Sequence, residues 1–77
     1  MIICDKNGLS LKSTMTAMET KKYSEKISAI SERARSMIRE LDYSNELIFL
    51  RVRTQKNEIM VAPDVDSYLI VVQEIEN

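Results

Sequence analysis

An apolar stretch between Leu47 and Asp64 restricts the fold more than any other part of this chain, because it needs contacts on two sides. Its first segment, Leu47–Arg53, opens with four consecutive apolar residues, and Glu58–Ala62 follows after a short polar turn. A strand with one solvent-exposed face alternates apolar and polar residues, whereas a continuous apolar run indicates cover on both faces. Pro63 then predicts a turn, since proline donates no hydrogen bond to a neighbouring strand. We therefore predict a β-hairpin whose first strand is too apolar to be a free edge.

The flanking segments predict a second hairpin, a final strand and a single domain. Met1–Cys4 and Leu9–Ser13 flank a turn at Asp5–Gly8, where asparagine and glycine tolerate positive φ. Asp66–Ile75 contains the continuous apolar run that is typical of a central strand. With one helix between the hairpins, the order is β-β-α-β-β-β. The sequence thus predicts an α+β fold, a five-stranded antiparallel sheet with one long amphipathic helix, as one domain over residues 1–77.

The helix has a start signal and two distinct flanks. Thr16 and Glu19 have the spacing of a capping box, although Thr20 is an alternative cap. Apolar residues recur at steps of three and four and form one stripe: Tyr23, Ile27, Ile30, Ala34, Met37, Ile38 and Leu41. We expect positions in this stripe, such as Ile30, to lie in the core. Beside it runs a row of small and polar residues: Ser24, Ser28, Ser31 and Arg35. This row is either a second contact face, because small side chains allow close approach, or a flank that faces water. A polar loop over Asp42–Glu46 follows.

The residue types present do not predict catalysis, a cofactor or a metal site. The chain has no histidine, which removes the commonest general base and the commonest metal ligand. Its only glycine is Gly8, so a glycine-rich phosphate loop is excluded. Asp64 and Asp66 lack the remaining ligands of a calcium loop. We therefore expect a protein that is not an enzyme.

Charge and hydropathy also restrict the partners. A formal charge of −1 gives no broad attraction to nucleic acid or to an anionic membrane, and the apolar runs are too short to span a bilayer. Arg51, Arg53 and Lys56 form one basic cluster, but nucleic-acid binding would need more positive charge and exposed aromatic residues. Cations on an edge strand that help to select a partner explain the cluster better. Cys4 is expected in the core, and one unpaired cysteine without a signal peptide fits a reducing cytoplasm.

Several runs resemble the roadblock family of dynein light chains. They are Phe49–Arg53, Lys56–Asp64 and Leu69–Gln73, with shorter matches upstream at Lys12–Met15, Ala34–Ser36 and Leu41–Asp42. The resemblance implies a homodimer in which the long helices pack together and the third strands pair, giving one ten-stranded sheet. The dimer or partner interface is accordingly expected at nine residues: Ser24, Ser28, Ser31, Arg35, Leu47, Phe49, Leu50, Arg51 and Arg53.

The same resemblance implies a function. It is that of a non-catalytic accessory light chain of the dynein motor, an adaptor that binds the dynein intermediate chain in microtubule-based transport. The expected location is the cytoplasm and its cytoskeleton, including a cilium or axoneme, and other light chains are further expected partners. The alternative is a roadblock-type scaffold or regulator of small GTPases.

One departure from the family pattern concerns the beginning of the chain. Roadblock proteins ordinarily start with an amphipathic helix on the sheet face opposite the long helix, whereas this sequence starts within the first strand. Without that helix, we expect apolar side chains from the set Met60, Leu69 and Val71 to be exposed. An exposed apolar patch favours association.

Overall fold

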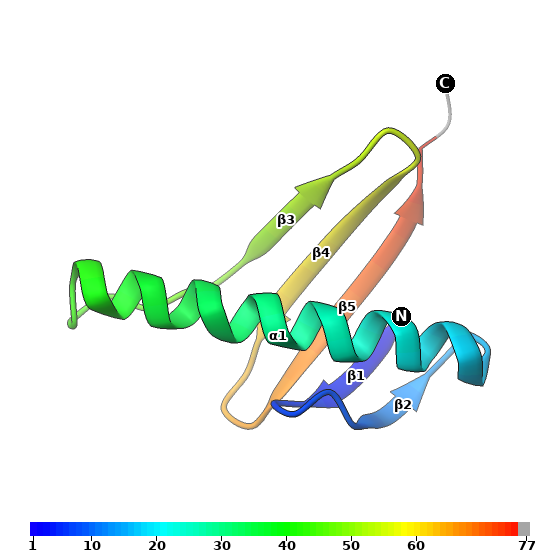
Figure 1. Ribbon diagram of the computed structural model, residues 1–77, viewed down its shortest axis with the longest axis horizontal. Helices are drawn as coiled ribbons and strands as arrows, with labels where there is room; N and C mark the ends of the chain where they lie inside the picture. Colours follow the sequence, from blue (N-terminus) through cyan, green and yellow to red (C-terminus); the bar gives the residue numbers. More distant parts are fainter. Residues whose placement is uncertain (76–77) are drawn as a thin grey trace.

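One long helix crosses one face of a five-stranded antiparallel sheet (Figure 1). The computed structural model describes residues 1–75, so residues 76–77 of the predicted domain lie outside it. The sheet order is β2-β1-β5-β4-β3, which places β2 and β3 at the two edges. The predicted α+β fold and the order β-β-α-β-β-β are confirmed. The elements are β1 (Ile2–Asp5), β2 (Ser10–Ser13), α1 (Ala17–Leu41), β3 (Leu50–Arg53), β4 (Asn57–Pro63) and β5 (Ser67–Glu74).

The turn between β1 and β2 forms where the sequence predicted it, and Gly8, not Asn7, has the positive φ. The carboxylate of Asp5 accepts hydrogen bonds from the N–H groups of Asn7 and Leu9, both at 2.9 Å. Gly8 has φ +87°, a conformation that residues with a Cβ rarely adopt. Gly8 is also buried against the helix, so this turn packs directly on α1.

Both ends of α1 are capped. Thr16 is the N-cap residue, and its Oγ1 accepts a hydrogen bond from the N–H of Glu19 at 3.2 Å. At the other end, the N–H of Asp42 donates to the carbonyl of Ile38 at 3.0 Å. The alternative cap, Thr20, lies inside the helix, where its hydroxyl is 2.7 Å from that of Ser13. Within residues 1–75, no helix is long and apolar enough to cross a membrane.

The helix turns its small polar flank most directly toward the sheet, while Tyr23 and Ile27 of the apolar stripe are half-buried and pack against the core. The buried residues of α1 are Thr20, Ser24, Ser28 and Ser31. The expectation that Ile30 lies in the core was wrong, since its side chain is 47% exposed. Small hydroxyl-bearing side chains let the helix backbone approach a sheet whose own side chains are large, and the apolar stripe is left at the side.

The core lies between α1 and one face of the sheet. Its fully buried apolar residues are Ile2, Cys4, Val61, Tyr68 and Ile70. The strand register puts them on one face, because Ile70 is opposite both Ile2 and Val61. The predicted core position of Cys4 is confirmed, and burial, with a smaller effect of Asp5, raises the pKa of its thiol.

The strand β3 is shorter than predicted. It begins at Leu50, not at Leu47, so Leu47 and Phe49 precede it. The N–H of Thr54 donates to the carbonyl of Asn57, which shows that Asn57 faces β3. Alternate residues of β4 point their backbone N–H and C=O groups toward β3, so Ile59, Val61 and Pro63 do so after Asn57. Pro63 has no N–H to donate. Pairing between β3 and β4 therefore stops at Leu50 and Val61.

Candidate interaction surfaces

The apolar stripe of α1 is the first candidate surface. Ile30, Met37 and Leu41, here called the helix stripe, have exposed side chains, and Leu41 reaches 77%. In Figure 1 the C-terminal end of α1 extends beyond the strands, so the sheet of the same chain does not cover the last turns of the helix. A regular apolar stripe on an ordered helix ordinarily packs on something. The helix stripe is thus available to a partner.

The outer edge of β3 is the second candidate surface. Thr54 faces β4, so the N–H groups of Arg51 and Arg53 point away from β4, toward the free side of the sheet. Such groups can pair with another strand. Phe49, just before β3, is 50% exposed. The structure thus places Phe49, Arg51 and Arg53 together along this edge.

The two arginines of β3 share one carboxylate. Glu58 on β4 lies 2.9 Å from Arg51 Nη2 and 3.8 Å from Arg53 Nη1, while both arginine side chains are more than half exposed. One carboxylate balances only one of the two charges, so this edge keeps a net positive charge. That cations here help to select a partner stays a prediction.

The predicted interface row on α1 does not lie on a free surface. Ser24, Ser28 and Ser31 are buried between α1 and the sheet of their own chain. Their role as a dimer or partner contact stays a prediction. Such a contact would require α1 to leave its sheet. Leu47 is half-buried in the loop before β3, and Leu50 packs against the core from the sheet edge.

Arg35, the fourth member of that row, belongs to a polar cluster that ties α1 to β5. The hydroxyl of Tyr68 donates to the Glu32 carboxylate, and Arg35 donates to the same hydroxyl at 3.4 Å. The Arg35 guanidinium also lies 5.8 Å from the centre of the Tyr68 ring. Burial, followed by the bond to Glu32, raises the pKa of Tyr68. The sequence analysis missed this cluster, for which the Glu32-to-Arg35 spacing on one helix face was the only local signal.

The sheet face opposite α1, here called the far face, is apolar at its centre. The register places Ile3 opposite Leu69, Met60 opposite Val71, and Ala62 opposite Leu69 on this face. Leu69 is exposed and Met60 and Val71 are half-buried, so the predicted exposure is confirmed for Leu69 and partial for the others. The Cα extents of 36 × 30 × 15 Å describe a flat, two-layer plate.

Metal-ligating side chains do not gather at one place in the described part of the chain. Across residues 1–75, no group of three or more carboxylate or cysteine side chains is placed to hold a metal ion. The described polar clusters consist of hydrogen-bonded or ion-paired side chains that hold elements together. Among the described residues, the helix stripe and the edge of β3 are two surfaces with unused binding capacity.

The chain exposes more surface than a monomer of its size should. Its accessible area is 5822 Å². Folded monomers follow a scaling law that gives roughly 4800 Å² for a mass of 8.9 kDa. The excess is about 1000 Å², close to the roughly 800 Å² that each partner buries in a standard protein interface.

Comparisons with known proteins agree on the family and the fold. The family model described as Roadblock/LC7 domain matches residues 1–74. A crystal structure of a Roadblock/LC7 domain from Streptomyces avermitilis superposes with a TM-score of 0.86 at 12% identity, covering 95% of this chain and 62% of that one. A structure titled MglB with tetrameric arrangement gives 0.80 at 9% identity, covering 95% and 57%. Myxococcus xanthus MglB gives 0.73 at 16% identity, covering 95% and 61%. The chain therefore spans about three-fifths of each of these chains.

Proposed function

Because this chain belongs to the Roadblock/LC7 domain family, we propose that it is a non-catalytic homodimerisation and adaptor module. The observation that carries the proposal is the excess of exposed surface, about 1000 Å² above that of a typical monomer of this mass. A small domain with a core of this size gains most from burying such surface in a symmetric dimer. A two-fold axis brings the same two surfaces of each copy together.

The helix stripe and the edge of β3 supply the two contacts of the proposed dimer. Pairing of β3 with its copy would satisfy the outward N–H groups of Arg51 and Arg53 and join two sheets into one of ten strands. Packing of the two helix stripes would bury Ile30, Met37 and Leu41. The serine row takes no part, because it already holds α1 on its own sheet.

We propose that the dimer is an accessory light chain of the dynein motor, which binds the dynein intermediate chain in microtubule-based transport. The resemblance in Lys56–Asp64 supports this choice, and these residues form β4 and the turns at its ends. The proposed location is the cytoplasm and its cytoskeleton, including a cilium or axoneme. Other dynein light chains are further candidate partners.

A roadblock-type scaffold or regulator of small GTPases is the second candidate function. Two of the three structures compared above are of MglB, and none of the three is titled as a dynein component. That fold similarity is consistent with the second candidate, because both functions use the same kind of module. The two candidates differ in the partner that the dimer recognises.

Sedimentation equilibrium tests the dimer with matched variants. Met37→Glu puts a charge in the helix stripe, and Met18→Glu makes the same change on α1 outside the stripe, where Met18 is 83% exposed. Arg51→Pro removes one outward N–H of β3, and Arg51→Ala is its control. We expect the wild type and both controls to be dimers, and Met37→Glu and Arg51→Pro to dissociate at least about tenfold more readily. A monomeric wild type would refute the dimer.

Binding experiments then separate the two partner classes. The wild-type dimer is mixed with a dynein intermediate-chain fragment and, separately, with GTP-loaded small GTPases. Saturable binding of the intermediate-chain fragment supports the light-chain function. Binding of the GTPases alone would replace it with the second candidate.

A further inference from the structure

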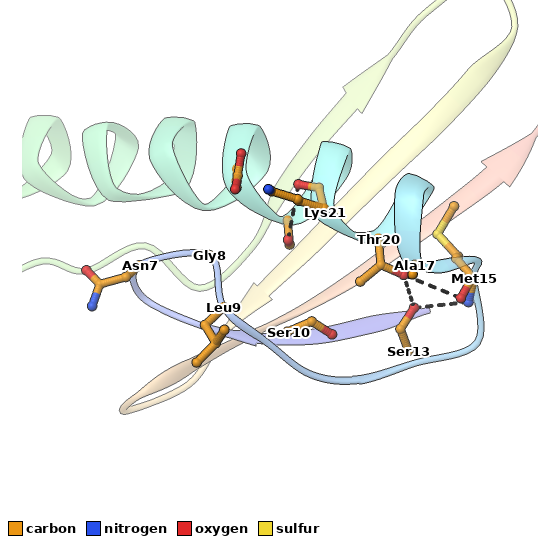
Figure 2. A pocket seen from close by; sticks show the side chains of 11 residues that line it. Asn7, Gly8, Leu9, Ser10, Ser13, Met15, Ala17, Thr20 and Lys21 are labelled. Carbon is orange, nitrogen blue, oxygen red and sulfur yellow. Dashed lines mark hydrogen bonds between the residues drawn. The ribbon is translucent and has the colours of Figure 1, made fainter.

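The two edges of the sheet differ in how their charges are balanced. At the β2 edge, a groove of about 570 Å³ lies between β2 and α1, and both Lys21 and Glu25 line it, so their charges offset one another. The hydroxyls of Ser13 and Thr20 in this groove are also paired, 2.7 Å apart (Figure 2). At the β3 edge, by contrast, two arginines share one carboxylate. Unbalanced charge therefore lies at the edge that the proposed dimer uses.

The arginines of β3 lie on the far face, next to its apolar centre. In the strand register Arg51 is opposite Met60 and Arg53 is opposite Glu58, and Met60 belongs to the far face. Glu74 of β5 belongs to the other face of the sheet, because the side chains of a strand alternate. Across β3, β4 and β5, the far face thus carries two positive side chains and one negative side chain.

The proposed dimer brings two such edges together. A two-fold axis between the β3 strands makes their pairing antiparallel, and residues opposite each other in an antiparallel pair have their side chains on the same face. Arg51 and Arg53 of both copies then form a single group of four, here called the arginine cluster. Only two Glu58 carboxylates accompany these four guanidinium groups, so two positive charges remain unbalanced.

The arginine cluster needs a further anion. Like charges directly opposite each other destabilise a strand pair. The side chains of Arg51 and Arg53 are more than half exposed, so their guanidinium groups are accessible from the far face. Arginine binds carboxylates through two parallel N–H donors. The distance of 2.9 Å between Arg51 Nη2 and Glu58 shows that a carboxylate fits at this place. The cluster therefore fits a ligand with several carboxylates.

The surroundings of the arginine cluster favour an acidic peptide over other polyanions. Beside the cluster the far face is apolar, with Leu69 exposed and Met60 and Val71 half-buried. In the dimer, these apolar areas lie on both sides of the cluster. A peptide with carboxylates at its centre and apolar side chains toward its ends matches this order. The formal charge of −1 on the whole chain gives no broad attraction to nucleic acid or to an anionic membrane.

We propose that the far face of the dimer binds an acidic segment of another protein across the two-fold axis, with carboxylates on Arg51 and Arg53 of both copies. This inference rests on the proposed dimer and deepens it, because the site is incomplete in a single chain. Since only the dimer has the complete site, the acidic segment also tightens the dimer by linkage.

Two peptides test the proposal. The probe is a short peptide with four glutamates at its centre and leucines toward both ends, and its twin has glutamine in place of each glutamate. We expect the glutamate peptide to bind the wild-type dimer at least about tenfold more tightly than the twin, and to lose this advantage as the salt concentration rises. In sedimentation equilibrium, the glutamate peptide should lower the dissociation constant of the dimer, and the twin should not.

Arg53→Gln and Lys12→Gln are a matched pair, because each removes one cation from the far face. Lys12 lies on β2, with three strands between it and β3, which is beyond the range of screened charges at physiological salt. We expect Arg53→Gln to weaken binding of the glutamate peptide about three- to tenfold, and Lys12→Gln to change it less than about twofold. Without peptide, Arg53→Gln should dimerise at least as well as the wild type, because a repelling charge is gone.

Glu58→Gln tests the charge balance in the opposite direction. The variant lacks the carboxylate that competes for the arginines, so the glutamate peptide should bind it about two- to fivefold more tightly than the wild type. The peptide-free dimer of Glu58→Gln should dissociate more readily. A damaged fold would not raise the affinity for the peptide, so this gain separates a charge effect from a loss of structure.

Four results would overturn the proposal while the wild-type dimer stays intact. They are equal binding of the two peptides, an unchanged dissociation constant of the dimer with the glutamate peptide, equal effects of Arg53→Gln and Lys12→Gln, and tighter binding of a single-stranded oligonucleotide or an anionic vesicle than of the glutamate peptide. A wild-type chain that stays monomeric with and without peptide would instead refute the proposed dimer, and this site with it.

Discussion

At Gly8 the chain has no room for a side chain, and this residue fixes how closely the first hairpin packs on α1. A Cβ built there would lie 2.9 Å from Ser28 Oγ, 3.0 Å from Glu25 Cα and 3.1 Å from the Ser24 carbonyl. The hydroxyl can rotate away, but the two backbone atoms cannot. The positive φ of Gly8 adds a second cost to any replacement.

We expect Gly8→Ala to lower the free energy of unfolding by about 2 kcal/mol or more, from positive φ and close contact together. Urea titration of the wild type and the variant measures the difference. The double variant Gly8→Ala with Ser28→Ala should recover only part of the loss, because the contacts to Glu25 and Ser24 are with backbone atoms. Full recovery in the double variant would show that the Ser28 hydroxyl alone is in the way.

Ser31 is expected to lower the stability of the fold through an unpaired buried hydroxyl. Its side chain is fully buried, and its hydroxyl has no hydrogen-bond partner among the described residues. Ser28, also buried, donates to the carbonyl of Glu25 at 3.1 Å. Removing an unpaired buried hydroxyl relieves a desolvation penalty, whereas removing a paired one loses a hydrogen bond.

Ser31→Ala should therefore leave stability unchanged or raise it by up to about 1 kcal/mol. Ser28→Ala is the matched control, and we expect it to be about 0.5–1.5 kcal/mol less stable than Ser31→Ala. Chemical denaturation of both variants provides the measurement. The explanation fails if Ser31→Ala is the less stable of the two.

At the scale of elements, the sequence predicted the position of α1 but not that its small polar flank is the most deeply buried face. Apolar periodicity and the Thr16 cap located the helix, because both are local properties. The choice of buried face depends on what packs above and below the helix. In an assembling protein, the apolar stripe can be reserved for a partner, while small residues such as Ser24 and Ser28 face the sheet of the same chain. Gly8, buried where the hairpin meets the helix, was the available signal for this close approach.

The start of β3 also depends on tertiary contacts that the local sequence does not show. An apolar run predicted a strand from Leu47, but a strand is paired only as far as its neighbour can supply hydrogen bonds. Pro63 of β4 has no backbone N–H to donate to β3, so Leu47 and Phe49 lie before the paired segment. The proline was visible in the sequence, while the register that brings it opposite this segment was not.

The Tyr68 hydroxyl, which links β5 to α1, should give the fold a dependence on alkaline pH. Burial and the bond to Glu32 raise the pKa of Tyr68, so the folded state holds this proton more tightly than the unfolded state does. The contribution is present below the ordinary tyrosine pKa of about 10 and is lost as the pH rises through the higher pKa of the folded state.

We expect Tyr68→Phe to be less stable than the wild type at neutral pH and to lose less stability between neutral pH and alkaline pH. Tyr43→Phe is the control, because Tyr43 is 88% exposed and should follow the wild type. Thermal melts of the three proteins across this range measure the effect. Parallel pH curves for Tyr68→Phe and the wild type would refute the linkage.

At the scale of the whole molecule, stability and assembly should be one property. A flat plate with a small core and exposed apolar surfaces gains stability when those surfaces are covered. If the helix stripe and β3 meet a second copy, the folded dimer is favoured by mass action, and the melting temperature must rise with protein concentration. A monomer would melt at one temperature whatever its concentration.

We therefore expect the melting temperature of the wild type to rise steadily over about a hundredfold range of concentration. Met37→Glu should lower it at high concentration and abolish the rise, because the side chain of Met37 is already 52% exposed in one chain and little is lost within the monomer. Met18→Glu should keep the rise. Calorimetry over the concentration series measures the melting temperature of each protein. A wild-type melting temperature that stays constant would mean that one chain is stable by itself, and that the excess surface of the fold serves a different protein.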